Sequence, residues 1–214
     1  MTRMFDRNRW ALAIFGRALI LGGLLGLISC GQQANGGKFV GNDVSSADFG
    51  RDFRLFDPYG HLRSLADFRG RYVVLFFGYT QCPDACPTAL ARAAEVRKQL
   101  GSDGDKVQAV FVTLDPERDT DVLMREYTSA FDPSFLGLRG DQAATRNVAE
   151  DFRVFYQKVP SGGSYTLDHS VLNYVFDPRG RLRLLWRPDE TAAQCVSDLR
   201  ILMKSERPFW RFFS

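Results

Sequence analysis

Two cysteines four residues apart are the side chains in this sequence whose types and spacing point most directly to chemistry. Cys82 and Cys86 lie in the segment GYTQCPDACP, residues 78–87. The preceding residues 72–77 are apolar and β-rich, and apolar residues recur at helical spacing over residues 87–100, so the thiols are expected where a strand gives way to a helix. The N–H groups of a helix N-terminus favour a thiolate, which is both a nucleophile and a metal ligand. The pair is therefore a candidate redox couple or metal site.

Pro87 marks the expected start of this helix. A proline suits the first helical position because the N–H group that it lacks would have had no partner there. Cys86 then falls in the N-cap region, and Cys82 lies one turn before it.

Strands and helices alternate along the rest of the chain. This order predicts an α/β fold, a thioredoxin-like sandwich with an N-terminal β-hairpin and a helical insertion between residues 120 and 152. The expected strands are 53–56 and 62–65, which form the hairpin, followed by 72–77, 107–114, 153–158, 171–176 and 182–186; the expected helices are 87–100, one capped by Asp119 or Thr120 that runs to residue 131, 141–152 and 191–204.

His169 is the residue outside the cysteine segment that could join the thiols. It lies just before the strand expected at residues 171–176, and the beginning of that strand faces the thiols in a thioredoxin-like sheet. On spacing alone, a ligand and an ordinary loop histidine are both open interpretations. His61 lies in the turn of the expected hairpin and is interpreted as a surface residue.

Asp115 follows the strand expected at residues 107–114, close to where the thiols should lie. One interpretation is a turn with Pro116 that leads into the capped helix. The other is a hydrogen-bonding role in which the carboxylate orients His169 or the backbone of a ligand, because such partners tune metal affinity.

The remaining cysteines have different expected roles. Cys195 lies among apolar positions of the helix expected at residues 191–204, and a buried cysteine behaves as a small, inert hydrophobe. Cys30 follows Leu27-Ile28-Ser29, which resembles a bacterial lipobox whose cysteine is lipidated. Four arginines and an uncharged apolar run at residues 18–28 precede it in a secretory layout. A plain signal-peptide end or a short uncleaved anchor is the alternative.

These features divide the chain into four segments. We expect a lipoprotein-type signal peptide at residues 1–29, a tether at 30–46, the thioredoxin-like domain at 47–206 and an aromatic tail at 207–214. The tail either dips into a membrane interface or packs on the domain. The signal segment holds four Arg and one Asp of the 28 basic and 25 acidic residues, so 24 of each remain. A neutral domain does not suggest nucleic acid as a partner.

Three separated blocks resemble the Sco/SenC family of copper proteins. They are GYTQCPDACP at residues 78–87, VTLDPERDT at 112–120 and LDHSVLNYVFDPRG at 167–180. The resemblance implies a membrane-tethered copper protein that helps to build the binuclear copper (CuA) site of cytochrome c oxidase. It implies that Cys82, Cys86 and His169 are the copper ligands. Two thiolates select soft metals, and a Cys₂His set suits copper, whereas zinc normally takes a fourth ligand.

The resemblance also implies where the protein works and with what. The expected partners are the copper-bearing subunit of the oxidase and a periplasmic copper donor or thiol reductant. A lipid on Cys30 would hold the protein on the bacterial inner membrane, facing the periplasm.

Two functional classes stay open for the thiol pair. One is a copper chaperone, which is not an enzyme; the other is a thiol-disulfide oxidoreductase that reduces client cysteines or senses redox state, with Cys82 and Cys86 as its redox pair. The spacing here is CxxxC, whereas thioredoxins have CxxC, and His169 with its neighbours occupies the region where thioredoxins have a substrate-binding proline. Both differences favour the copper chaperone.

Overall fold

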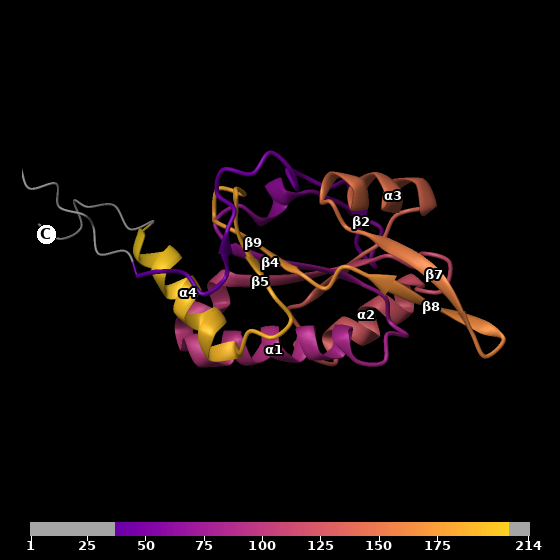
Figure 1. Ribbon diagram of the computed structural model, residues 1–214. Coiled ribbons are helices and arrows are strands. Elements are labelled where there is room, and N and C mark those ends of the chain that lie inside the picture. Colours follow the sequence, from indigo (N-terminus) through magenta and orange to yellow (C-terminus); the bar gives the residue numbers. More distant parts are fainter. Residues whose placement is uncertain (1–36, 206–214) are drawn as a thin grey trace, which may run out of the picture. The chain divides into compact units, whose positions relative to one another are not determined.

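The computed structural model describes residues 37–205, which form a six-stranded mixed sheet with helices on both faces (Figure 1). The strand order is β1-β10-β9-β4-β5-β6, in which β4 pairs in parallel with β5 and antiparallel with β9. The strands of this sheet are β1 (Asn42–Asp43), β4 (Tyr72–Gly78), β5 (Val107–Thr113), β6 (Leu136–Leu138), β9 (Asn173–Phe176) and β10 (Leu182–Trp186).

Two separate hairpins accompany the sheet. The first pairs β2 (Leu55–Phe56) with β3 (Leu62–Arg63), as the sequence predicts, and the second pairs β7 (Tyr156–Ser161) with β8 (Ser164–His169). The helices are α1 (Ala85–Leu100), α2 (Asp121–Ser129), α3 (Gln142–Asp151) and α4 (Ala192–Ser205), with short 3₁₀ helices η1 (Leu65–Phe68) and η2 (Gly101–Lys106).

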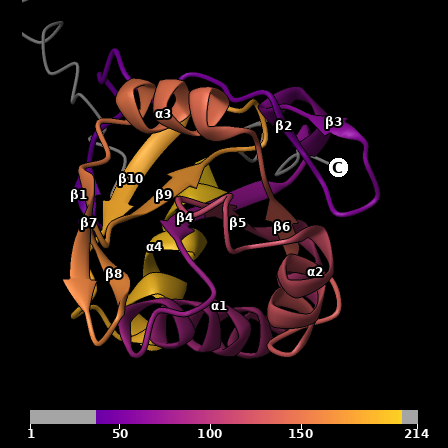
Figure 2. The same ribbon diagram turned by 90° about the vertical axis from the view of Figure 1, so that its right-hand side faces the viewer.

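The central strands β4 and β5 are buried along their whole length, which explains why they are continuous apolar runs. Helices α1, α2 and α4 lie on one face of the sheet and α3 lies on the other (Figures 1 and 2). The sheet is therefore covered on both sides, and both faces carry buried cores. This is the predicted α/β sandwich.

Helix α1 begins at Ala85, two residues before the expected start. Asp84 is its N-cap residue, so Cys86 is the second helical residue and Pro87 the third. A proline is tolerated here as well as at the first position, because no N–H group in the first turn has an intrahelical partner. Cys86 is thus fully inside the helix.

Three strands were not predicted from the sequence. Strand β6 lies within the insertion expected to be helical and adds a parallel edge to the sheet, and β1 adds the opposite edge. Strand β8 is the most important for the site, because His169 is its last residue rather than a loop residue before the next strand. Only Leu167 of β8 is fully buried, so its sequence lacks a clear apolar alternation.

The folded domain also begins earlier than residue 47. Two carboxylate oxygens of the buried Asp198 accept hydrogen bonds from the N–H groups of Val40 and Gly41, at 2.8 and 2.9 Å. Strand β1 follows directly and pairs with β10. Part of the expected tether at 30–46 therefore belongs to the domain.

Several expectations concern other residues. The signal peptide at 1–29, Cys30 and the aromatic tail at 207–214 lie outside the residues that the structure describes. Within residues 37–205, no helix has the length and apolar character needed to cross a membrane.

Candidate metal centre

The cysteine pair lies at the carboxyl end of β4, where the loop into α1 holds both sulfurs close together. Cys86 is completely buried, whereas Cys82 is half-buried in the loop. The N–H group of Cys86, free in the first turn of α1, lies 3.4 Å from the Cys82 sulfur and donates to it. The helix N-terminus thus stabilises charge on Cys82; the sequence predicts this effect for the pair without distinguishing the two thiols.

His169 reaches the same point from β8. Its Nε2 atom lies 3.7 Å from the Cys86 sulfur, and Nδ1 lies 2.8 Å from the carbonyl oxygen of Ser170. Because Nδ1 must donate its proton to that carbonyl, Nε2 keeps a free lone pair directed at the thiols. The edges of Phe76 and Tyr79 fix the ring, with centroids 6.2 and 5.9 Å away.

The three side chains fit a shared metal ion. The two sulfurs and a ring nitrogen lie within 4.8 Å of one another. An ion about 2.3 Å from a sulfur and about 2.0 Å from a nitrogen holds these two ligand atoms roughly 3.5–3.8 Å apart. The 3.7 Å between Cys86 and His169 matches that separation. Cys82, Cys86 and His169 are therefore placed to coordinate one ion.

The two sulfurs have opposite electrostatic character. The hydrogen bond from the Cys86 thiol, with further ones from the backbone N–H groups of Asp84 and Cys86, lowers the pKa of Cys82. The same interaction and its burial raise the pKa of Cys86. Cys82 is thus the sulfur that carries the negative charge in the absence of a metal.

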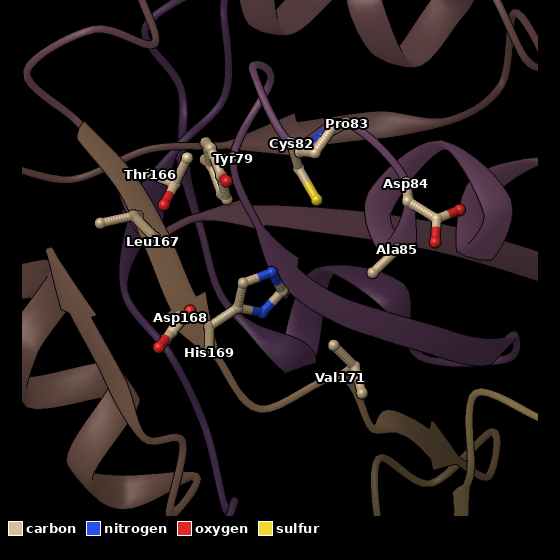
Figure 3. A pocket seen from close by; sticks show the side chains of 10 residues that line it. All are labelled: Tyr79, Cys82, Pro83, Asp84, Ala85, Thr166, Leu167, Asp168, His169 and Val171. Atoms are coloured by element: carbon tan, nitrogen blue, oxygen red, sulfur yellow. The ribbon is translucent and has the colours of Figure 1, made fainter. Parts of the chain in front are cut away.

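A pocket of about 430 Å³ leads from the surface to the ligands (Figure 3). Figure 3 shows the imidazole of His169 turned toward the Cys82 sulfur across this pocket. An ion or a partner's ligand can therefore reach the site directly. The pocket is lined by Tyr79, Cys82, Pro83, Asp84, Ala85, Thr166, Leu167, Asp168, His169 and Val171.

Comparison with known proteins identifies the family. The family model described as SCO1/SenC matches residues 42–204, which is most of the chain. The chain belongs to the SCO1/SenC family. A relative named "Protein SCO2 homolog, mitochondrial", from Bos taurus, is 37% identical over 164 residues, which are 75% of this chain and 62% of the relative. The chain spans about three fifths of that relative's length.

Solved SCO1/SenC structures confirm the thioredoxin-like fold. Bradyrhizobium japonicum ScoI with copper bound is 41% identical, with a TM-score of 0.65, and the match covers 71% of this chain and 98% of that one. Apo Sco1 from Thermus thermophilus is 39% identical, with a TM-score of 0.69, covering 77% and 97%. The first of these contains copper, so the metal fits this fold.

Asp115 lies near the metal centre. Among the described residues, its carboxylate makes no hydrogen bond to Cys82, Cys86 or His169. Its buried carboxylate accepts hydrogen bonds from Arg118 at 2.5 Å and from the Tyr165 hydroxyl at 2.8 Å. Tyr165 belongs to β8, four residues before His169. Strand β8 is therefore one route by which Asp115 can influence His169.

Asp119, which the sequence predicts to lie in a turn or to cap a helix, holds the loop of the metal centre. Thr120, not Asp119, caps α2. The completely buried carboxylate of Asp119 accepts two hydrogen bonds from Thr80, one from its N–H group at 3.1 Å and one from its hydroxyl at 2.5 Å. It accepts a third from the Thr113 hydroxyl at 2.5 Å. Burial raises the pKa of Asp119. It anchors the loop that carries Cys82, and only its place in an Asp-rich turn could have drawn attention to it.

Gly78 was quoted in the sequence motif but given no role of its own. A Cβ atom at this position would lie 2.5 Å from the Cys86 sulfur and 2.9 Å from the Phe111 ring. Atoms this close would collide, so the last residue of β4 must lack a side chain for Cys86 to occupy its place.

Cys195 and His61 take the roles expected of them. Cys195 is buried in α4, and burial raises the pKa of its thiol to about 12. His61 lies in the turn after β2, where its exposed ring contacts Asp57 at 3.1 Å. Neither residue belongs to the metal centre.

These environments predict a large difference in thiol reactivity. In the reduced, folded protein, iodoacetamide should modify Cys82 at least about 100-fold faster than Cys195, because the thiolate is the nucleophile and only Cys82 combines a lowered pKa with access from the pocket. Mass spectrometry of digested samples over time measures each rate. Denaturant should make the rates similar, and comparable labelling of both cysteines in the folded protein would contradict the assignment.

Proposed function

We propose that this chain binds one copper ion through Cys82, Cys86 and His169 and delivers it to the copper-bearing subunit of cytochrome c oxidase. The observation that carries the proposal is the convergence of two sulfurs and one ring nitrogen within 4.8 Å at the end of an open pocket. Membership of the SCO1/SenC family supports it, as does the copper bound in Bradyrhizobium japonicum ScoI.

The donor set favours copper over zinc. Thiolates are soft ligands that select Cu(I), and an added imidazole also suits Cu(II). Structural zinc sites normally have four protein ligands. Within residues 37–205, the cluster consists of three potential ligands, Cys82, Cys86 and His169. A three-ligand site that opens to a pocket also suits an ion that must leave again.

The cellular setting is part of the same proposal. The signal segment at residues 1–29 and lipidation of Cys30 would tether the domain to the periplasmic face of the bacterial inner membrane. There it would receive copper from a periplasmic donor and serve the oxidase CuA site. Assembly of the CuA centre is the expected role, and a thiol reductant is the second expected partner.

Copper titration of the reduced protein tests the proposal. We expect one equivalent to bind, with thiolate-to-copper charge transfer bands in the Cu(II) form. A Cys82→Ser/Cys86→Ser double variant that keeps its thermal stability should lose both. Equal binding by this variant would exclude the cysteine site.

Oxidation of the thiols should abolish copper binding. A disulfide between Cys82 and Cys86 removes both thiolate ligands, because a disulfide sulfur cannot ligate as a thiolate does. We expect about one copper per chain in the reduced protein and less than about 0.1 after oxidation, as measured by elemental analysis after gel filtration. Added reductant should restore binding. Tight uptake of one copper by the fully oxidised protein would rule out the thiols as ligands.

A thiol-disulfide oxidoreductase is the second candidate function, and the asymmetry of the two cysteines favours it. Cys82 is accessible and has a lowered pKa, which suits an attacking thiol, while the buried Cys86 suits the thiol that resolves the mixed disulfide. Reduction of a disulfide peptide from the oxidase subunit, at a rate that depends on Cys82 and not on His169, would support this activity.

A further inference from the structure

The β7–β8 hairpin, which carries His169 at its end, is fastened to the loop after β5 by Arg118. Figure 1 shows this hairpin projecting from the rest of the domain. The Arg118 guanidinium donates to the Asp115 carboxylate at 2.5 Å and to the carbonyl oxygen of Tyr165 at 2.9 Å. Its central carbon also lies 3.7 Å from the centre of the Tyr165 ring. The Arg118 side chain therefore contacts both the backbone of β8 and the aromatic ring of Tyr165.

Asp115, Arg118 and Tyr165 each contact the other two, and the ion pair among them is largely buried. The hydroxyl of Tyr165 donates to the second oxygen of Asp115 at 2.8 Å, so Asp115, Arg118 and Tyr165 form a ring of contacts. The Asp115 side chain is 1% exposed and that of Arg118 is 17% exposed. Charge-assisted hydrogen bonds are stronger in such surroundings than at the surface. We refer to these three residues as the clamp.

The arginine also has a feature that stability alone does not explain. Its Nη2 atom is buried and has no hydrogen-bond partner among residues 37–205. An unsatisfied buried donor costs free energy, so a purely stabilising residue would be better placed with all donors paired. The guanidinium instead lies near a second ring, 5.9 Å from the centre of Tyr79, and Tyr79 in turn contacts His169.

The clamp and the metal ligand lie on one strand. Tyr165 and His169 are separated by four residues in β8, and residues at even spacing in a strand point to the same face. A shift of β8 away from the loop after β5 would therefore carry the imidazole away from the Cys86 sulfur, now 3.7 Å distant. The thiols, which belong to the loop after β4 and to α1, would stay in place.

We propose that Arg118 is a positioning residue that keeps His169 within coordinating distance of the two thiols, and so determines whether copper is held by three ligands or by two. This inference rests on the proposed copper function and deepens it. With the clamp closed, the Cys₂His set accommodates Cu(II); with the clamp open, two thiolates remain, a set that Cu(I) accepts.

The first test compares Cu(II) and Cu(I) affinities of Arg118→Ala with those of the unchanged protein. We expect Cu(II) affinity to fall by about 10- to 100-fold, the range for lost partners of a metal ligand, and Cu(I) affinity to change by less than about threefold. The nitrogen splitting in the Cu(II) electron paramagnetic resonance spectrum should weaken. Arg118→Lys keeps the charge without both hydrogen bonds and should resemble the alanine variant; full rescue by lysine would contradict the clamp.

Lys158→Ala is the matched control. Its ammonium group also lies over the Tyr165 ring, at 4.4 Å, but its ion pair is with the exposed Glu117 rather than with Asp115. We expect its Cu(II) affinity to stay within about twofold of the unchanged protein, because an exposed ion pair contributes little. A loss equal to that of Arg118→Ala would contradict a specific role for Arg118.

A double-mutant cycle with His169→Ala separates positioning from general destabilisation. If Arg118 acts through His169, its replacement should not reduce Cu(II) affinity further in the His169→Ala background. Additive losses would overturn the proposal. Should Arg118→Ala fail to fold, Tyr165→Phe keeps the ring and removes the hydroxyl that bonds to Asp115 and also interacts with Lys158. The same cycle applies to it, Lys158→Ala controls for the lysine interaction, and the expected loss is about tenfold, the low end of the range for lost partners of a metal ligand.

A readout without copper keeps this inference distinct from the proposed function. In the apo protein, Arg118→Ala or Tyr165→Phe should accelerate amide hydrogen exchange in residues 166–169 by at least about tenfold while β4 keeps its protection. Unchanged exchange in β8 would overturn the clamp even if copper binds. If exchange is accelerated but the unchanged protein binds no copper, the clamp holds β8 in place and the proposed copper function is wrong. The proposed effect of Arg118 on the number of copper ligands would then be wrong as well.

Discussion

Replacing His169 with alanine should weaken Cu(II) binding by at least about 100-fold while lowering Cu(I) affinity by less than about tenfold. Cu(II) favours nitrogen ligands, and here His169 supplies the imidazole next to the buried sulfur, whereas Cu(I) can stay with two thiolates. The loss of a direct ligand should exceed the 10- to 100-fold effect typical of its hydrogen-bonding partners. Competition titrations with chelators of known affinity measure both constants, and the charge transfer spectrum reports the change of ligand set.

His61→Ala provides the control for this experiment. His61 has an exposed ring in the hairpin formed by β2 and β3. Its ring contacts Asp57, which is not a ligand of the metal centre. Its replacement should leave Cu(II) affinity within about twofold, the range in which surface substitutions fall. If both variants lost affinity equally, or if His169→Ala kept the original spectrum, the assignment of His169 as a ligand would be wrong.

Replacing Gly78 with alanine should damage both stability and copper binding. The added methyl group would meet the Cys86 sulfur at 2.5 Å and Phe111 at 2.9 Å, and neither can move freely in a packed core. Overpacking of this kind costs about 1–3 kcal/mol of unfolding free energy. Because relief of the collision displaces Cys86, copper affinity should also fall by at least about tenfold. Denaturant unfolding and copper titration measure the two effects.

Gly137→Ala, in the neighbouring part of the sheet, separates these two effects. A Cβ atom there would lie 3.0 Å from the end of the Met124 side chain and 3.3 Å from the Met124 backbone oxygen, and its nearest neighbours include no copper ligand. We expect it to destabilise the protein by about 1 kcal/mol or more, since overpacking usually does, with copper affinity unchanged. Equal copper affinity in Gly78→Ala would show that Cys86 does not need its present position.

The thiols and the core strands could be predicted from the sequence because their signals are local. Residues 72–77 form an unbroken apolar run before the cysteine pair, and the structure places β4 there. Pro87 similarly marked the helix within two residues of its actual start. The contact between His169 and the thiols was suggested by family resemblance, since a ligand 83 residues from Cys86 leaves no local signal.

The parts that sequence reasoning missed depend on contacts between distant segments. Strand β8 is polar on most of its surface and is a strand because it pairs residue by residue with β7. Asp119 reads as a helix cap, and its role emerges only when Thr80 and Thr113 come to lie beside it. Gly78 has an ordinary strand conformation, so its importance lies wholly in what would collide with a side chain.

Helix α1 acts as a spacer between the copper site and the point where the chain enters the domain. Cys86 lies in its first turn, while its last turn packs with α4, whose Ile201 lies against Gly37. Sixteen helical residues measure about 24 Å. If Cys30 carries a lipid, as we propose, the six residues between Cys30 and Gly37 can span at most about 25 Å. The helix and the tether would then be of similar length, so both would limit how far the ligands can lie from the lipid. A longer tether should therefore change copper delivery only to a client whose own copper centre lies at a fixed distance from the membrane.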